Sequence, residues 1–299
     1  MKLLVTFPGK HGDSLWALPT LRALAEANGG HVDLLMAPAY SGILPLYRAQ
    51  AYIGRADAWP SWQVQNTAPM TPWSPFEETL HHEALGVSAG YEAILHLGYR
   101  EWPTAPMHQY VYSIAQREYP TVPIAPLDLD RPWITLLLPR PGSLIIGPDA
   151  AAWPPMDIVS GWADEHFELK YGVESLALRN LNRGRQTYRT IRRVSAPKSR
   201  WVAEGDDPAY SWEAAAFALL QAKVFFGCCS ALHVLACAMG KRLVMMEPAE
   251  ARWNPIFWPY GQDGPRVMLV KGNDGRPTWD ARHCADALRG ALEAAHARR

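Results

Sequence analysis

The chain has 299 residues, of which 48% are hydrophobic and 19% are charged. This composition excludes a disordered protein, and the length suits two domains of ordinary size. Lys and Arg balance Asp and Glu at 29 each, so the formal net charge is zero. The protein as a whole therefore has no net charge that would attract nucleic acid or acidic membranes. Any such attraction must come from a local cluster of charged residues.

The hydropathy of the chain and its cysteines favour a cytoplasmic location. The first apolar run ends at Pro8-Gly9, far short of a signal peptide. A second apolar run, residues 217–240, is interrupted by Lys223 and His233, which favours a buried strand and helix over a transmembrane segment. The cysteines show no zinc-binding spacing and are expected to be buried, reduced thiols. We therefore expect a cytoplasmic protein and leave open a peripheral position at the inner membrane.

The N-terminal half alternates strand and helix signals. Short apolar runs predict buried parallel strands, and leucines at helical spacing predict helices. The expected strands are residues 2–7, 31–36 and 91–97, and the expected helices are residues 14–27 and 107–118. Residues 57–78 are rich in Trp and Pro and show neither helical nor strand periodicity, which predicts a long loop. The prolines between residues 120 and 142 predict a stiff linker between domains.

The C-terminal half repeats the alternation. Helices are expected at residues 155–165, 211–222, 231–239 and 281–295, and strands at residues 143–146, 167–169, 175–178, 224–226 and 242–246. Two successive strand–helix series predict an α/β protein with two Rossmann-like, doubly wound domains, residues 1–130 and 131–299. We expect a ligand in a central cleft between them, at the carboxyl ends of the strands.

The sharpest local signal lies between the first strand and the first helix, in Gly9-Lys10-His11-Gly12-Asp13. Two glycines let the backbone approach a ligand, and a helix N-terminus offers N–H groups to an anion. Asp13 has two interpretations: it caps the helix, or its carboxylate is a general base at the mouth of the cleft. The spacing is neither a dinucleotide-binding fingerprint nor a P-loop.

The matching segment of the second half is Gly227-Cys228-Cys229-Ser230, followed by a helix that contains His233. Small side chains leave room for a phosphate on the amides near Cys229 and Ser230. The alternative is a tight strand–helix turn with inert cysteines and a core or capping histidine.

Together these segments resemble the ADP-heptose:lipopolysaccharide heptosyltransferases. The start of the pattern is Gly9-x-x-Gly12-Asp13-x-Leu15-x-x-Leu18-Pro19. The C-terminal part is Gly227, five residues, His233-x-x-Ala236-x-Ala238-x-Gly240-Lys241, then a strand and Glu247-Pro248. Trp153-Pro154 also falls where the family has a Trp-Pro pair.

The resemblance implies a glycosyltransferase-B fold, with the acceptor on the N-terminal domain and a nucleotide sugar on the C-terminal domain. It implies inverting transfer without a metal or any cofactor beyond the donor, with Asp13 at the catalytic position. The implied donor residues are Trp153, Gly227, Cys228, Cys229, Ser230, His233 and Glu247. Two departures stand out: Cys228-Cys229-Ser230 replaces the family's Asp-Ser/Thr-Gly, and Ala150-Ala151-Ala152 replaces a basic residue before Trp-Pro. They imply either a different donor or an altered site.

A basic run without acidic residues spans positions 179–200. The guanidinium group of arginine can donate two parallel hydrogen bonds to a phosphate. The run is therefore a candidate site for a polyanion, including a nucleic-acid backbone. The candidate contacts are Arg183, Arg185, Arg189, Arg192 and Arg193. A solvated basic loop is the alternative interpretation.

We therefore predict a glycosyltransferase that uses a nucleotide-diphosphate sugar and a bacterial glycan or lipid-linked glycan, such as lipopolysaccharide. Two alternatives stay open. One is a phage-type enzyme that glycosylates modified DNA bases, which the basic run allows. The other is a non-catalytic protein that binds sugar nucleotides or glycans, which the Cys-Cys-Ser departure suggests.

Overall fold

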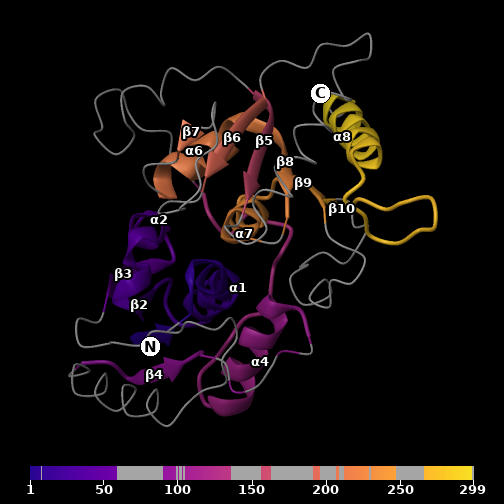
Figure 1. Cartoon of the computed structure of the whole chain (residues 1–299). Helices are drawn as coiled ribbons and strands as arrows, with labels where there is room; N and C mark the ends of the chain where they lie inside the picture. Colours follow the sequence, from indigo (N-terminus) through magenta and orange to yellow (C-terminus); the bar gives the residue numbers. More distant parts are fainter. Residues whose placement is uncertain are drawn as a thin grey trace. The chain divides into compact units, whose positions relative to one another are not determined.

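The structure is a computed structural model that describes residues 1–7, 9–58, 90–98, 100, 103, 105–135, 156–162, 191–195, 207–208, 212–228, 230–246 and 266–297. The chain divides into two compact units, Met1–Thr135 and Leu136–Arg299, and each contains one parallel β-sheet (Figure 1). The strands expected at 143–146, 167–169 and 175–178, and residues 59–78 of the expected loop, lie outside the described residues.

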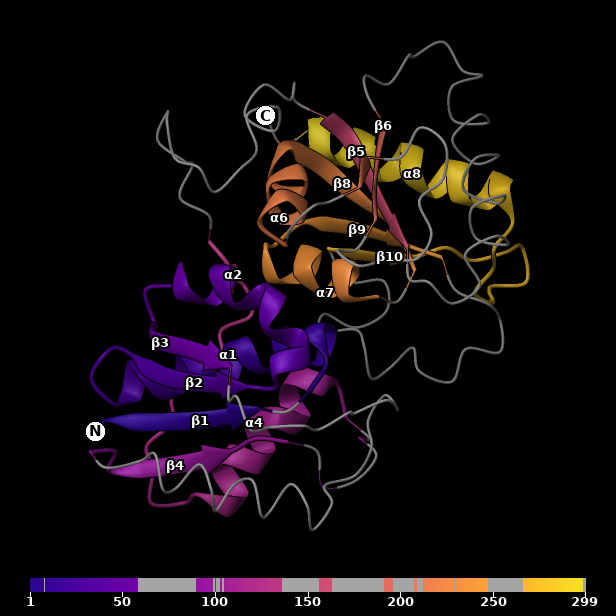
Figure 2. The same cartoon turned by 60° about the vertical axis from the view of Figure 1, so that its left-hand side comes forward.

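Unit 1 contains a four-stranded sheet in the order β3-β2-β1-β4, which runs from top to bottom in Figure 2. The strands are β1 Leu3–Phe7, β2 Val32–Met36, β3 Ile53–Ala58 and β4 Ala93–His96. Every residue of β1 and β2 is buried, as the apolar runs predicted for strands inside a parallel sheet. Val5 of β1 pairs with Leu34 of β2 on one side and Leu95 of β4 on the other.

The helices of unit 1 are α1 His11–Ala27, the 3₁₀ helix η1 Pro38–Ile43, α2 Leu44–Arg48 and α4 Met107–Glu118. The long helices α1 and α4 pack against each other, and α1 also contacts the sheet. The elements η1, α2 and β3 were not predicted. Pro38 and Pro45 at the first turns of η1 and α2 are the signal that could have found those helices.

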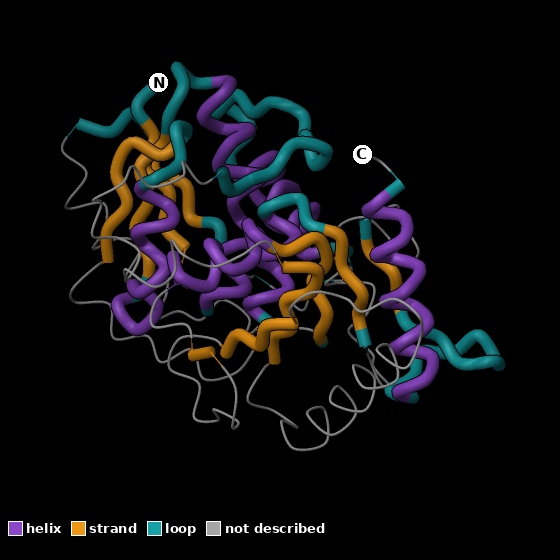
Figure 3. The backbone as a smooth tube through the Cα atoms, turned by 90° about the horizontal axis from the view of Figure 1, so that it is seen from above, coloured by secondary structure: helices purple, strands orange, loops and turns teal. Residues whose placement is uncertain are grey.

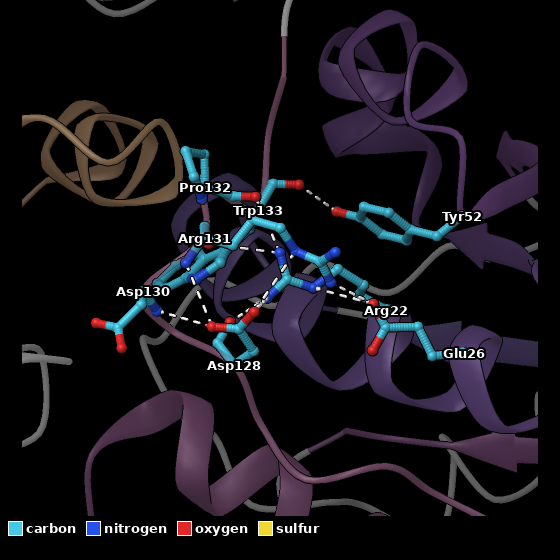
Figure 4. Close-up of polar contacts among 8 residues, drawn as sticks. All are labelled: Arg22, Glu26, Tyr52, Asp128, Asp130, Arg131, Pro132 and Trp133. Carbon is cyan, nitrogen blue, oxygen red and sulfur yellow. Dashed lines mark hydrogen bonds and ion pairs between the residues drawn. The ribbon is translucent and has the colours of Figure 1, made fainter.

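Residues 120–135 pack on unit 1, and the division between the units, after Thr135, falls within the segment 120–142 that the sequence predicted as a linker. The buried Arg22 guanidinium of α1 donates to the main-chain oxygens of Asp128 and Pro132 (Figure 4). Trp133 is fully buried. Prolines remove main-chain donors and interrupt regular structure, but they leave carbonyl groups that an arginine can bind. The segment is therefore irregular in backbone and still belongs to the core.

The division between the units follows from the same packing. Thr135 N–H donates to Gln50 Oε1 at 2.9 Å, and the Tyr52 hydroxyl donates to Trp133 O at 2.5 Å. Unit 1 therefore extends to Thr135, whereas the sequence predicted a division after residue 130.

Unit 2 contains a six-stranded parallel sheet in the order β10-β9-β8-β5-β6-β7. The strands are β5 Met156–Trp162, β6 Ile191–Ser195, β7 Asp207–Pro208, β8 Ala222–Gly227, β9 Arg242–Met245 and β10 Val267–Leu269. The helix predicted at residues 155–165 is wrong, because β5 occupies most of that range. Ile158 of β5 pairs with Ile191 and with Val224, so strands on both sides satisfy its backbone.

Helices cover both faces of the sheet of unit 2. They are α6 Trp212–Gln221, α7 Ala231–Ala238 and α8 Ala281–His296. Figure 1 shows α8 on one side of the strands and α6 and α7 on the other. In Figure 3, α8 is the helix next to the C label and lies beside the strands. Val224 and Phe226 of β8 pack toward Leu288 and Leu292 of α8. This is the doubly wound arrangement that the sequence predicted. None of the helices described here combines the length and the apolar character that crossing a membrane requires.

A histidine is buried between α1 and α4 of unit 1. His108 of α4 is fully buried beside Trp16 of α1, with ring centroids 6.1 Å apart. Within the described part of the chain, neither of its ring nitrogens has a hydrogen-bond partner. Burial therefore lowers the pKa of His108 from 6.5 to about 4.

We predict that stability falls as pH drops from about 6.5 toward 4, because only the unfolded chain binds the His108 proton in that window. The slope from this residue is about 1.4 kcal/mol per pH unit. Denaturant unfolding at several pH values should show that His108→Phe removes this slope. The control His31→Gln changes an exposed histidine and should keep it. An unchanged slope in His108→Phe would contradict the prediction.

Candidate functional site

The first candidate site lies at the carboxyl end of β1, where the chain turns into α1. Gly9 and Lys10 form the described part of the turn, and α1 begins at His11. A Cβ on Gly9 would overlap the Phe7 ring and lie 2.8 Å from Cβ of Asp13. Only glycine fits there without a shift of its neighbours. The turn therefore brings the backbone directly against the first helical turn. The predicted approach of this backbone to a ligand stays a prediction.

Asp13 occupies the third position of α1 and caps it. The Lys10 N–H donates to Asp13 Oδ2 at 3.3 Å, and the carboxylate also suits the positive end of the helix dipole. The side chain is half-buried. The capping interpretation is confirmed, and the cap fixes the direction of the carboxylate. A role for Asp13 as a base stays a prediction.

The sequence did not single out Tyr40, which lies next to this turn. Its ring packs edge-on against His11, with centroids 5.3 Å apart and planes at 79°. Burial raises the pKa of Tyr40, and the negative charge of Asp13 raises it further. Tyr40 belongs to η1, which follows β2, the neighbour of β1. Carboxyl ends of adjacent parallel strands share one edge, and this rule could have pointed to Tyr40.

The second candidate site lies in unit 2 between β8 and α7. Gly227 ends β8, and Cys228 is buried behind it. Ser230 caps α7: its Oγ accepts from the His233 N–H at 3.3 Å, while the Ser230 N–H donates to His233 Nδ1 at 3.1 Å. His233 is itself buried. These reciprocal bonds make His233 a capping residue, and its contact with a donor stays a prediction.

Lys241, from the same sequence pattern, has a structural role. Gly240 ends α7 in the left-handed region, with φ of 68°. The Lys241 ammonium then donates to Leu220 O at 2.8 Å and to Ala222 O at 3.1 Å, and so joins α6 to β8. Burial lowers the pKa of Lys241 to about 8.

Several predicted site residues lie outside the described part of the chain: Trp153, Cys229, Glu247, Arg183, Arg185 and Arg189. Arg192 and Arg193 lie in β6, in register with Val159 and Ser160 of β5. The basic run is therefore not one continuous loop, because sheet pairing includes residues 191–195. Among the described residues, no three His, Cys, Asp or Glu side chains could hold a metal ion together.

No protein-family model matches the chain, and no curated protein matches it. Solved structures do. E. coli heptosyltransferase WaaC with ADP-2-deoxy-2-fluoro heptose is 13% identical, with a TM-score of 0.53 over 98% of this chain and 99% of that chain. The glycosyl transferase family 9 protein from Veillonella parvula DSM 2008 is 10% identical, with a TM-score of 0.57 over 98% and 97%.

A third solved structure, E. coli ADP-heptose lps heptosyltransferase II, is 15% identical, with a TM-score of 0.53 over 98% of this chain and 99% of that chain. At such identities the likeness shows the fold. The predicted α/β fold of two Rossmann-like units, of the glycosyltransferase-B type, is confirmed, and so is the resemblance in fold to heptosyltransferases.

We predict that Gly9→Ala lowers the free energy of unfolding by about 1–3 kcal/mol, because the added methyl group forces Phe7 and Asp13 apart. Denaturant unfolding measures the loss. Gly290→Ala in α8 is the matched control. Apart from the neighbouring residues and the backbone of α8 itself, no atom lies within 4 Å of the Cβ that it adds, so it should stabilise the helix slightly. Equal stability of Gly9→Ala and the wild type would show that the turn tolerates a side chain.

Proposed function

We propose that the chain is a glycosyltransferase that moves a sugar from a nucleotide-diphosphate sugar to an acceptor hydroxyl. The observation that carries the proposal is the place of Asp13. It is a half-buried carboxylate in the first turn of α1, at the carboxyl end of β1, in a fold shared with solved heptosyltransferases. Ligands of open parallel sheets bind at this edge. A carboxylate there can take a proton from a bound substrate.

In the proposed reaction, the acceptor oxygen attacks the anomeric carbon of the donor while the bond from that carbon to the diphosphate breaks. Asp13 accepts the hydroxyl proton as the new bond forms, and the nucleoside diphosphate leaves with the electron pair. Attack opposite the leaving group inverts the anomeric centre. The step needs stabilisation of the departing negative charge, which helix N-termini and arginine can supply without a metal.

The start of α7 supports an anion site in unit 2. Its first turn, residues 231–233, carries no acidic side chain, so no carboxylate of its own offsets the positive end of the helix. The first turn of α1 differs, because it carries Asp13. We therefore place the donor diphosphate near Ser230 and the acceptor near Asp13, with the other proposed donor residues being Trp153, Gly227, Cys228, Cys229, His233 and Glu247.

The solved neighbours guide the choice of substrates. One was solved with an ADP-heptose analogue, and another is named for ADP-heptose and lipopolysaccharide. ADP-sugars are the first donors to test, and glycans of lipopolysaccharide are the first acceptors. A thermal-shift screen of nucleoside diphosphates and their sugars should give one base and sugar that stabilise the native protein, since a ligand of the folded state raises its stability. Mass spectrometry then detects transfer, and NMR gives the anomeric configuration. A protein that no nucleotide sugar stabilises would contradict the proposal.

We predict that Asp13→Asn binds the nucleotide sugar normally and transfers at least about 100-fold more slowly, because asparagine keeps the cap and removes the base. Initial rates at saturating donor and acceptor measure the loss. Asp33→Asn is the matched control. It changes a carboxylate of the same unit that accepts from the Tyr91 hydroxyl at 2.7 Å, and it should keep the transfer rate. Near wild-type transfer by Asp13→Asn would leave Asp13 as a helix cap only.

We predict that Ser230→Trp weakens nucleotide binding by at least about tenfold, because an indole at the N-cap of α7 blocks the approach of a diphosphate to the N-terminus of the helix. Calorimetric titration measures the dissociation constant. Ser230→Gly is the control, since glycine costs a cap only a few tenths of a kcal/mol and adds no bulk. Equal nucleotide affinity of Ser230→Trp and the wild type would place the donor site elsewhere.

A further inference from the structure

Two buried hydroxyl groups lie side by side behind the first turn of α1. The Tyr47 hydroxyl of α2 is 2.7 Å from Ser14 Oγ, and Ser14 Oγ donates to the main-chain oxygen of His11 at 3.0 Å. Serine has one hydroxyl proton, and His11 O accepts it. Tyr47 must therefore be the donor to Ser14. Both side chains are buried, and Tyr47 is 0% exposed. The result is a short chain of hydrogen bonds from α2 to the turn that carries Asp13.

Tyr47 is the donor end of this series of hydrogen bonds, and contacts that do not involve α1 hold its helix, α2, in place. Arg48, next to Tyr47, donates through Nε to Ala56 O of β3 at 2.8 Å. The buried Gln50 just after α2 donates to Leu46 O at 2.7 Å and accepts from Thr135 N–H. α2 is therefore anchored to the sheet edge and to the end of unit 1.

We propose that Tyr47 is a positioning residue for Asp13, acting through Ser14 to hold the first turn of α1 in one conformation. This inference rests on the proposed function, in which Asp13 is the base. His11, whose carbonyl Ser14 binds, and Asp13 belong to the same helical turn. A reacting group displaced by about 1 Å can lose a rate factor of about 100. Burial raises the pKa of the Tyr47 hydroxyl, so it stays protonated and keeps donating near neutral pH.

The test compares two tyrosines of unit 1 that each lose one hydroxyl. Tyr47→Phe keeps the ring and removes the donor to Ser14. Tyr52→Phe removes a hydrogen bond of the same kind, to Trp133 O, away from the first turn of α1. Both variants should lose a similar amount of thermal stability. Tyr47→Phe should also lose about tenfold in kcat, with the KM for the donor unchanged, whereas Tyr52→Phe should keep kcat.

Hydrogen exchange gives a readout that does not depend on transfer. The Ser14 N–H donates to Lys10 O at 2.8 Å, so its exchange rate reports opening of the first turn of α1. We expect faster exchange in Tyr47→Phe and in Ser14→Ala, and a wild-type rate in Tyr52→Phe. The double variant Tyr47→Phe/Ser14→Ala should lose no more kcat than either single variant. Each single change already removes the hydrogen bond between the two hydroxyl groups.

The outcomes separate this inference from the proposed function. If Asp13→Asn transfers at the wild-type rate, the role of Asp13 as base fails, and exchange at Ser14 still tests whether Tyr47 holds the turn. If Asp13→Asn is inactive and Tyr47→Phe matches Tyr52→Phe in kcat, the positioning role is overturned. Equal Ser14 exchange in Tyr47→Phe and the wild type overturns it whatever the activity.

Discussion

Unit 1 depends on the buried guanidinium group of Arg22. Its side chain is only 6% exposed, and it donates to the main-chain oxygens of Asp128, Arg131 and Pro132 (Figure 4). Burial lowers the pKa of Arg22, because removal from water disfavours the charged guanidinium. The carbonyls of an irregular, proline-rich segment need donors as much as the arginine needs acceptors. Arg22 therefore meets both requirements and holds residues 128–132 on α1.

Helix α1 is therefore in contact with the rest of unit 1 along its whole length. Near the C-terminal end of α1, Asn28 donates to Pro123 O at 2.6 Å, in addition to the contacts of Arg22. Trp133 packs against Trp16 near the middle, with ring centroids 5.5 Å apart. At the first turn, Ser14 meets Tyr47. These contacts hold α1, whose first turn carries Asp13, against the rest of unit 1.

The strand-to-helix junctions of the two units have a similar backbone and differ in the charge at the start of the helix. In both, a strand with a mostly buried apolar sequence ends in a glycine or a glycine-containing turn, and a helix begins within a few residues. α1 carries an acid in its first turn, and α7 carries none. A carboxylate of its own first turn thus partly offsets the dipole of α1, and the first turn of α7 has no such carboxylate. The base proposed in unit 1 and the anion site proposed in unit 2 both start from this difference.

The sequence alone determined the features that local physics controls. Apolar runs located β1, β2, β4, β8 and β9, helical spacing located α1, α4, α6, α7 and α8, and the two glycine-rich junctions were recognised as candidate sites. Tertiary structure decided the rest. Met156–Trp162 is a strand because β6 and β8 flank it, and no window of sequence contains those partners. Residues 120–135 belong to unit 1 because side chains far away in the sequence, Arg22, Asn28 and Tyr52, bind their carbonyls. Prolines by themselves do not reveal such contacts. Tyr40 and Tyr47 reach the turn at Asp13 from outside the motif, because parallel pairing of β1 with β2 brings the segments after both strands to one edge.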